Sequence, residues 1–193
     1  MALWRDDSPS VELTTRELRL RAPCADDYEA WAKLRAASRR HTEEWEPAWT
    51  EDELTRTAYR GRLRRYDHDW KDGRGAPFFI IRKKDNLLVG ACNLNNIKRG
   101  VMQSADIGYW IGAPYVRRGY ARQAVRRTLA FAFDELQLHR IEAAVQPGNT
   151  ASRILLEEIG FQYEGLARGF LRIAGEWRDH DRLALLSGDM MHG

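Results

Sequence analysis

The sequence has few of the residues that build disulfide frameworks or metal sites. Its 193 residues include two cysteines, Cys24 and Cys92, which lie far apart and outside any C-x-x-C pattern. No disulfide scaffold is therefore expected, and free thiols in a reducing compartment are predicted. The five histidines are scattered, without cysteines or acids at metal-ligand spacing. We therefore expect no metal.

Long apolar runs are also missing. No stretch approaches the roughly 20 apolar residues that a membrane-spanning helix needs. The first ten residues, MALWRDDSPS, lack the apolar segment of a signal peptide. The expectation is a cytoplasmic protein with no membrane partner. The net charge is only +3, so no strong nucleic-acid binding is predicted either.

Three widespread active-site motifs are absent from the chain. It contains no G-x-x-x-x-G-K-[ST] phosphate loop, no G-x-G-x-x-G dinucleotide fingerprint and no G-x-S-x-G nucleophile elbow. What remains is a chain with 44% hydrophobic residues, long enough for one domain with its own core. We expect this domain over residues 11–187, with a flexible N-terminal tail over 1–10 and a C-terminal tail over 188–193.

The most informative stretch covers residues 105–161. In chain order it predicts a strand over 105–111 (ADIGYWI), a basic glycine turn, a helix from Tyr120 to Leu136, a strand over 139–145, and a helix capped by Asn149 or Thr150 and ended by Gly160. Such a strand–helix–strand–helix unit places its two strands in one sheet.

The basic turn of this unit, RRGYAR (117–122), lies between a strand end and a helix start. Backbone N–H groups at a helix start have no helical partner, and the helix dipole adds partial positive charge. Three arginines add full charge, and Gly119 allows close approach of a ligand to the backbone. The turn therefore predicts a phosphate site.

The rest of the chain predicts a mixed, mainly antiparallel sheet. The expected elements are a strand over 11–21, a helix capped by Asp26 and reaching about Arg39, a helix opening at Thr50 and reaching about Tyr66, a polar loop over 67–77, a hairpin turning at Asp85-Asn86, a strand over 101–111, and a final strand pair joined near Ala174-Gly175. This order gives one α/β (α+β) domain, with about seven strands and helices on both faces.

The order of these motifs resembles the GCN5-related N-acetyltransferase (GNAT) family. The resemblance rests on the order of the elements in residues 105–161. A strand is followed by the turn RRGYA (117–121) and a helix, and a second strand is followed by PGNTAS (147–152), a second helix and Gly160-Phe161. One departure is Val116, where the family usually has Gln or Arg. The segments HTEEWEP (41–47), NNIKRG (95–100) and 163–180 resemble the ribosomal-protein-alanine N-acetyltransferases of the RimJ/RimL type, RimJ-type members above all. The resemblance spans nearly the whole chain.

This resemblance implies the GNAT fold, acetyl-CoA as the acetyl donor, and the N-terminal alanine of a ribosomal protein as the acceptor. The implied cofactor-binding residues are Tyr109, Trp110, Ile111, Arg117, Arg118, Gly119, Tyr120, Ala121, Arg122 and Asn149. Of these, Tyr109 to Ile111 act through their backbone, and their side chains can equally be core aromatics and aliphatics. Asn149 can alternatively be a helix N-cap alone.

The resemblance also implies the catalytic residues. Ser152 is placed to donate a proton to the leaving thiolate, with an exposed first-turn serine as the alternative. Asp106 falls near the family's strand glutamate and is the candidate base, although a strand-edge acid facing water, or Glu176 or Asp179 as the base, stays open. Without a nucleophile placed for an acyl-enzyme, transfer is expected to be direct, in a ternary complex.

An acidic, aromatic cluster surrounds Trp45 and Glu46, with Glu43 and Glu44 beside them. It suits the binding of a cationic N-terminus, or it is a solvated loop between helices. Three other functions remain open: acetylation of a polyamine, aminoglycoside or amino-acid derivative, a non-catalytic role in ribosome assembly or acyl-CoA binding, and nucleic-acid binding by the arginine-rich helix over 56–65.

Overall fold

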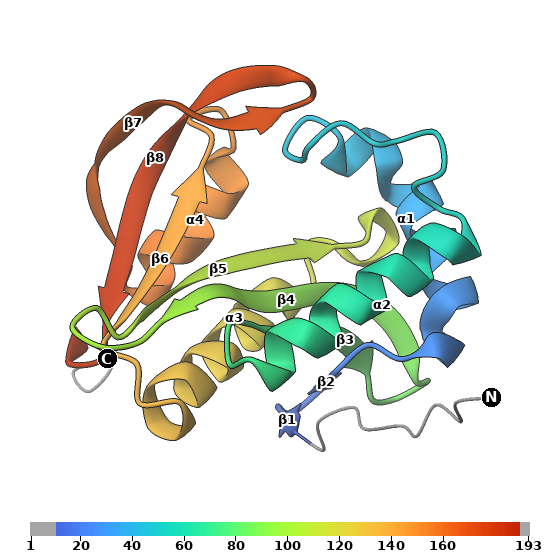
Figure 1. Ribbon diagram of the computed structural model, residues 1–193, viewed down its shortest axis with the longest axis horizontal. Helices are drawn as coiled ribbons and strands as arrows, with labels where there is room; N and C mark the ends of the chain where they lie inside the picture. Colours follow the sequence, from blue (N-terminus) through green and yellow to red (C-terminus); the bar gives the residue numbers. More distant parts are fainter. Residues whose placement is uncertain (1–10, 190–193) are drawn as a thin grey trace.

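One eight-stranded sheet with helices on both faces forms the protein (Figure 1). This computed structural model describes residues 11–189, so the expected tail over 1–10, and all but the first two residues of the tail over 188–193, lie outside the described part. The expected fold class is confirmed, with one strand more than the approximate seven.

The helices and strands have the following bounds: β1 Glu12–Thr14, β2 Leu18–Arg21, α1 Tyr28–Thr42, α2 Arg56–Lys71, β3 Ala76–Arg82, β4 Leu87–Lys98, β5 Ser104–Ile111, α3 Tyr120–Ala130, β6 Arg140–Val145, α4 Thr150–Ile159, β7 Gln162–Ile173 and β8 Glu176–Leu186. The strand order is β1-β2-β3-β4-β5-β6-β8-β7. All neighbours are antiparallel except β5 and β6, which are parallel. The predicted strand–helix–strand–helix unit is therefore confirmed.

The central strands separate two hydrophobic cores. Every residue of β3 is buried, and its side chains alternate between the cores, Phe78 and Ile80 in one and Phe79 and Ile81 in the other. Helical residues complete each core: Val125 and Leu129 of α3 with Leu156 of α4 in the first, and Trp31 and Leu34 of α1 with Tyr59 of α2 in the second. Thus α3 and α4 cover one face of the sheet, and α1 and α2 cover the other.

The first predicted strand, over 11–21, is two paired strands. The hydroxyl of Thr15 accepts a hydrogen bond from the Leu18 amide at 3.0 Å, and the Thr15 amide donates to the Leu18 carbonyl at 2.9 Å. This side-chain turn reverses the chain, because a short polar side chain can replace a ladder hydrogen bond. It accounts for the additional strand.

The two N-terminal helices begin later than the sequence predicts. Asp26 lies in a 3-10 turn before α1, and it is Asp27 that accepts from the Cys24 amide, at 2.9 Å. In the second helix, Thr55 is the cap, because its hydroxyl accepts from Ala58 N at 3.2 Å. The Thr50 hydroxyl bonds the Asp52 carboxylate instead, at 2.7 Å.

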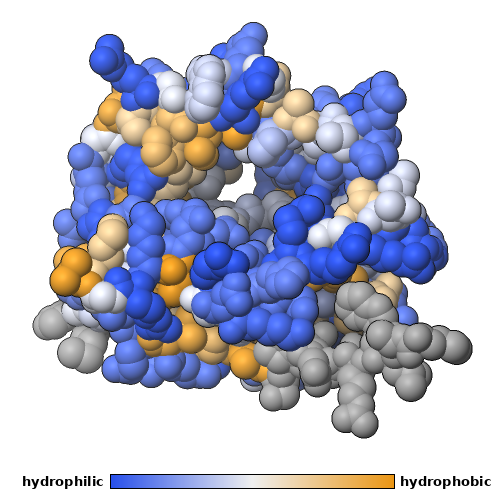
Figure 2. All heavy atoms as spheres, in the orientation of Figure 1, coloured by the Kyte–Doolittle hydropathy of each residue, from blue (hydrophilic) through white to orange (hydrophobic). Residues whose placement is uncertain are grey.

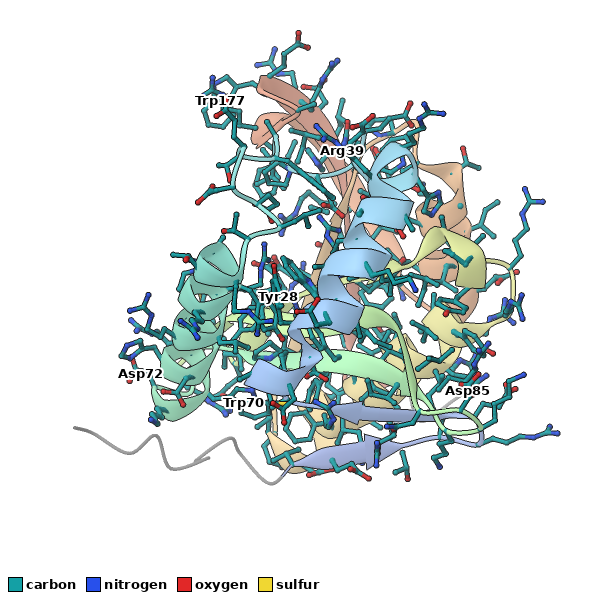
Figure 3. The ribbon with its side chains drawn as sticks, turned by 90° about the vertical axis from the view of Figure 1, so that its right-hand side faces the viewer. Tyr28, Arg39, Trp70, Asp72, Asp85 and Trp177 are labelled. Atoms are coloured by element: carbon teal, nitrogen blue, oxygen red, sulfur yellow. The ribbon has the colours of Figure 1, made fainter. Side chains whose placement is uncertain are left out.

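The same helix also runs further than predicted. It ends at Lys71, so much of the predicted polar loop over 67–77 is helical. Trp70, labelled in Figure 3, lies near the end of this helix. Its ring packs edge-on against Phe78 and Phe131, with centroid distances of 5.4 and 6.3 Å. This apolar contact stabilises a last turn that has little apolar character in its sequence.

Candidate active site

The two central parallel strands separate after a short paired stretch. β5 and β6 pair only between Ser104–Asp106 and Arg140–Glu142. Beyond it, residues 107–111 of β5 pair with β4 alone, and residues 143–145 of β6 pair with β8 alone. Figure 1 shows this divergence of β5 from β6. We call the part of the sheet that ends at β5 and the part formed by β6, β8 and β7 the two arms, and Figure 2 shows the molecule hollowed between them. The facing backbone edges can bind an extended ligand by main-chain hydrogen bonds.

The predicted cofactor strand residues lie on this open edge. The last part of β5 is formed by Tyr109, Trp110 and Ile111. Each of them pairs with a residue of β4, and none has a partner in β6. Their side chains alternate between the faces of the sheet: Tyr109 packs against the α3/α4 core and Trp110 against the α1/α2 core. The two aromatic side chains are thus partly buried against the cores, and the backbone edge stays accessible to a ligand.

The basic turn follows β5 and opens α3. Gly119 has a φ of 73° and Arg117 a φ of 59°, both left-handed, and no side chain caps the helix. Arg117 and Arg118 are exposed, whereas Arg122 pairs with Glu158. Open N–H groups, a helix N-terminus and exposed guanidinium groups together fit a phosphate group.

Two other residues of this turn, Tyr120 and Ala121, direct their side chains into the protein and leave only their backbone for a ligand. Tyr120 is 6% exposed and belongs to the α3/α4 core, and Ala121 packs against the same core. Because their side chains hold α3 on the sheet, the first-turn amides are fixed in direction. A ligand at this turn therefore meets a preorganised backbone.

A hydrogen bond between two hydroxyls joins the arms near their divergence. The Tyr109 hydroxyl of β5 lies 2.7 Å from Ser152 Oγ, in the first turn of α4. The amide of Ser152 donates to Asn149 Oδ1 at 3.2 Å, so Asn149 is an N-cap of α4. Burial raises the pKa of Tyr109 to about 12, and the bond to Ser152 opposes this rise. The phenol therefore stays protonated at neutral pH.

Asp106 lies on the opposite face of β5 from this pair. By strand alternation its side chain shares the α1/α2 side with Trp110, three residues and roughly 10 Å along the strand from Tyr109. Its carboxylate accepts from Asn96 Nδ2 at 2.8 Å. The candidate acid and the candidate base thus reach the divergence from opposite faces of the sheet.

The two alternative bases have other partners. Glu176 pairs with Arg178 at 2.6 Å, and Asp179 accepts from the Gly169 amide at 2.7 Å. Both lie in the β7–β8 hairpin. Glu176 is thus engaged in an ion pair, and Asp179 in a hydrogen bond from the backbone.

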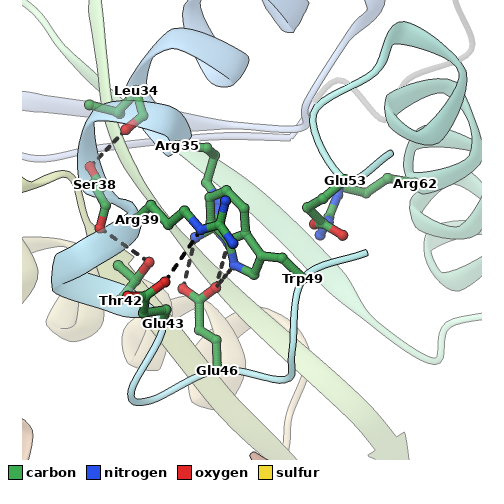
Figure 4. A network of polar contacts seen from close by, with 10 residues as sticks. All are labelled: Leu34, Arg35, Ser38, Arg39, Thr42, Glu43, Glu46, Trp49, Glu53 and Arg62. Carbon is green, nitrogen blue, oxygen red and sulfur yellow. Dashed lines mark hydrogen bonds and ion pairs between the residues drawn. The ribbon is translucent and has the colours of Figure 1, made fainter. Parts of the chain in front are cut away.

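Glu46 is held by a buried arginine of α1 (Figure 4). Arg35 is 6% exposed and binds both carboxylate oxygens of Glu46, one of them at 2.7 Å. Its guanidinium carbon lies 4.6 Å from the ring centroid of Trp49 and 4.9 Å from that of Trp110. The charge of Glu46 is thus compensated inside the protein.

Trp45 lies beside a pocket between the α1–α2 connection and the β7–β8 hairpin. The pocket has a volume of about 410 Å³ and is lined by Trp45, Gln146, Pro147, Gly148, Trp177, Arg178 and Asp179. In Figure 3, Trp177 and Arg39 of α1 lie at the same end of the molecule. Of the two residues predicted to bind the acceptor, Trp45 therefore lines a cavity, whereas Glu46 forms an ion pair with Arg35.

Sequence reasoning missed two functional candidates, the Tyr109 hydroxyl and Arg35. Arg35 carried a signal: it falls on the buried face of α1, at helical spacing from Trp31, Leu34 and Ser38. A charged residue on such a face needs a partner. The Tyr109 contact carried none, because its partner lies 43 residues away in the sequence.

Within residues 11–189, no helix is both long and apolar enough to cross a membrane. In the same range, no group of three or more His, Cys, Asp or Glu side chains is arranged to hold a metal ion.

Comparison with known proteins places the fold in a family. The Acetyltransferase (GNAT) domain family matches residues 17–162. The [ribosomal protein uS5]-alanine N-acetyltransferase of Escherichia coli is 31% identical over 192 residues, 98% of either chain. The probable N-acetyltransferase YjcK of Bacillus subtilis is 36% identical over 163 residues, covering 84% of this chain and 90% of the relative.

A solved structure of Mycobacterium smegmatis RimJ in complex with CoA-disulfide is similar throughout. It has a TM-score of 0.85 and 35% identity, and the match covers 90% of this chain and 83% of that one. With its diverging β5 and β6, its uncapped basic turn and these relatives, the chain belongs to the GNAT acetyltransferase family.

Proposed function

We propose that this protein transfers the acetyl group of acetyl-CoA to the N-terminal alanine of a ribosomal protein. The activity is supported above all by the diverging β5 and β6 edges beside an uncapped basic helix start. The acceptor is supported by the match to the uS5-alanine N-acetyltransferase over 98% of both chains. A match of this extent includes the α1–α2 connection and the β7–β8 hairpin, which lie outside the donor site.

The donor side is formed by the turn and the β5 edge. In this proposal the turn over 117–122 holds the pyrophosphate through its backbone amides and the guanidinium groups of Arg117 and Arg118. The backbone of Tyr109, Trp110 and Ile111 pairs with the pantetheine arm. A backbone N–H at this edge can stabilise the oxyanion that develops on the thioester carbonyl. The amide group of Asn149, whose oxygen caps α4, supplies a polar contact at the far edge.

The chemistry is one direct transfer. The amine nitrogen forms a bond to the acetyl carbon, the carbon–sulfur bond breaks, and the amine loses a proton while the sulfur gains one. An α-amine has an unperturbed pKa of about 8, so a weak base suffices. Asp106, directly or through water, takes that proton on the α1/α2 face. Ser152 donates to the departing sulfur on the other face, where the N-terminus of α4 also favours a thiolate.

The acceptor enters on the face that carries Asp106. Trp45 contributes an aromatic wall to the pocket beneath the β7–β8 hairpin. Glu46 contributes to the acceptor side by fixing the position of the connection that carries Trp45. The connection over 43–55 carries six acidic residues and no lysine or arginine, which favours a cationic chain end over an anionic one.

The test is thiol release from acetyl-CoA with a panel of acceptors. The panel holds Ala-, Ser- and Met-starting ribosomal peptides, the same Ala peptide already acetylated at its N-terminus, a polyamine and an aminoglycoside. Turnover with the free Ala peptide and none with its acetylated form supports the proposal. Turnover with a small amine alone replaces the acceptor, and acetyl-CoA binding without turnover on any acceptor contradicts an enzymatic function.

A further inference from the structure

The chain after α1 crosses from one arm of the divergence to the other. We call residues 43–49 the bridging segment. Its Glu46 carbonyl accepts from the Ala174 amide, in the β7–β8 turn, at 3.0 Å. Its Glu44 carbonyl accepts from Gln146 Nε2, in the turn between β6 and α4, at 3.0 Å. The segment is therefore bonded to two turns of the β6–β8 arm.

On the β5 side the segment is held by Arg35. The guanidinium group binds the Glu46 carboxylate at both oxygens and lies between the rings of Trp49 and Trp110. Trp49 Nε1 also donates to Glu46 Oε2 at 3.4 Å. Figure 4 shows Arg35 of α1 against Glu46 and Trp49 of the bridging segment. With its contact to Trp110, one buried side chain thus joins α1, the bridging segment and the end of β5.

The helix that carries Arg35 is itself fixed to the end of β5. The hydroxyl of Ser38 accepts from the Ala113 amide at 3.0 Å. Gly112 lies so close to Leu34 that an added Cβ would be 2.4 Å from Leu34 Cδ1. With α1 fixed in this way, Arg35 is the buried side chain that ties the bridging segment to the β5 side.

These contacts close a ring around the α1/α2 side of the divergence. The ring runs from β5 through Arg35 and the bridging segment to the β7–β8 turn, and Asp106 and Trp45 lie on this side. The donor residues Tyr109 and Ser152 and the turn over 117–122 lie on α3, α4 and the other face of β5. Except at Trp110, whose indole faces Arg35 while its backbone is assigned to the donor, the ring therefore borders the proposed acceptor side.

We propose that Arg35 is a positioning residue for the acceptor. It holds the bridging segment closed, and in doing so it sets the affinity for the acceptor peptide without setting the affinity for acetyl-CoA. This inference rests on the proposed function for the identity of the acceptor. A lysine cannot replace the arginine, because only the planar guanidinium binds a carboxylate at two points while stacking between two rings.

The experiment compares Arg35→Lys with the matched control Arg39→Lys. Arg39 lies one turn further along α1, also faces the Trp49 ring, at 5.3 Å, and pairs with Glu43 at 3.3 Å, but its side chain is 61% exposed. We expect Arg35→Lys to raise the KM for the Ala-starting peptide at least tenfold and to leave the KM for acetyl-CoA within twofold. Arg39→Lys should leave both constants within twofold.

Amide hydrogen exchange gives a second readout that does not depend on the acceptor. The Ala174 amide is protected by Glu46 only while the bridging segment is closed. We expect Arg35→Lys and Glu46→Gln to speed exchange of Ala174 and of residues 43–49 at least tenfold, with exchange in α3 unchanged. Circular dichroism and the melting temperature check that both variants remain folded.

The outcomes separate this inference from the proposed function. If the wild type acetylates no peptide, the proposed function fails, and exchange still decides whether Arg35 closes the segment. If the wild type is active but Arg35→Lys leaves the peptide KM or the exchange rates unchanged, the inference is overturned. A variant that raises both KM values alike, or speeds exchange throughout the chain, shows a merely structural role and also overturns it.

Discussion

Removing the Tyr109 hydroxyl tests whether Ser152 is an oriented proton donor. In Tyr109→Phe the ring keeps its packing against the α3/α4 core. The two contacts of the hydroxyl with Ser152 are lost, at 2.7 Å to Oγ and 3.4 Å to the carbonyl oxygen. Because the pKa of Tyr109 is raised to about 12, the phenol is protonated at any working pH. It can donate to Ser152 Oγ and leave the serine proton directed at the sulfur.

The expected fall in kcat follows from the loss of one hydrogen bond. Such a bond contributes about 0.5–1.5 kcal/mol net, and its loss in the transition state lowers kcat roughly 2- to 12-fold. Ser152→Ala removes the donor itself and should lower kcat by about 100-fold, the low end of general acid catalysis. In the Ser152→Ala background, Tyr109→Phe should lower kcat less than it does in the wild type, because the hydroxyl has lost its contact with Oγ and keeps only the 3.4 Å contact with the carbonyl of residue 152.

The assay is thiol release at saturating acetyl-CoA and peptide for the wild type, both single variants and the double variant. Tyr59→Phe is the matched control: its buried hydroxyl donates to the Cys24 carbonyl at 2.8 Å, far from the divergence. It should lower stability and leave kcat unchanged. An equal loss of kcat from Tyr109→Phe with and without Ser152 would refute the pairing.

Other changes test separate parts of the site and the fold. Gly119→Ala places a Cβ at a φ of 73°, which costs about 1–2 kcal/mol. It should raise the acetyl-CoA KM and leave the peptide KM unchanged in initial-rate measurements. Trp45→Ala should do the reverse, raising the peptide KM about tenfold through the loss of one pocket wall, equivalent to about 1.4 kcal/mol. Gly90→Ala puts a Cβ 2.2 Å from a backbone oxygen of β5 and should lower the free energy of unfolding in urea by about 3 kcal/mol. Burial raises the pKa of Tyr109 and of Cys92 to about 12 each, from 10.0 and 9.0. Because the unfolded chain releases these protons first, stability should fall as the pH rises above about 9, by up to about 1.4 kcal/mol per pH unit for each group. Urea unfolding between pH 8 and 11 measures this slope, and Tyr109→Phe should make it shallower above pH 10.

Local physics was enough to predict the basic turn that we propose as the donor site. Gly119 and Gly160 have the left-handed φ values of 73° and 118° that their places at helix ends predict, and Asn149 caps α4 as its residue type allows. Each of these features depends on a few neighbouring residues. The strand–turn–helix order, and with it the position of the phosphate turn, could therefore be predicted without knowing the fold.

The start of the second helix was predicted at the wrong threonine. A capping-box pattern at Thr50 predicted the start there, but Thr50 bonds Asp52 and it is Thr55 that caps the helix. Each threonine can cap a helix for about 1 kcal/mol. Residues 50–55 form turns of their own, with bonds from Glu53 N to the Thr50 carbonyl and from Thr55 N to the Asp52 carbonyl, and a capping pattern does not reveal them.

The catalytic side of the site depended on tertiary structure throughout. Tyr109 meets Ser152 across the point where β5 and β6 separate after pairing for three residues, and Arg35 reaches both Glu46 and the Trp110 ring of β5. The spacing of α1 indicates that Arg35 is buried, but neither spacing nor periodicity names the partners of these side chains. The sequence by itself determined the fold class and the position of the basic turn, and the tertiary structure decided which side chains face one another, because those contacts join residues from different elements.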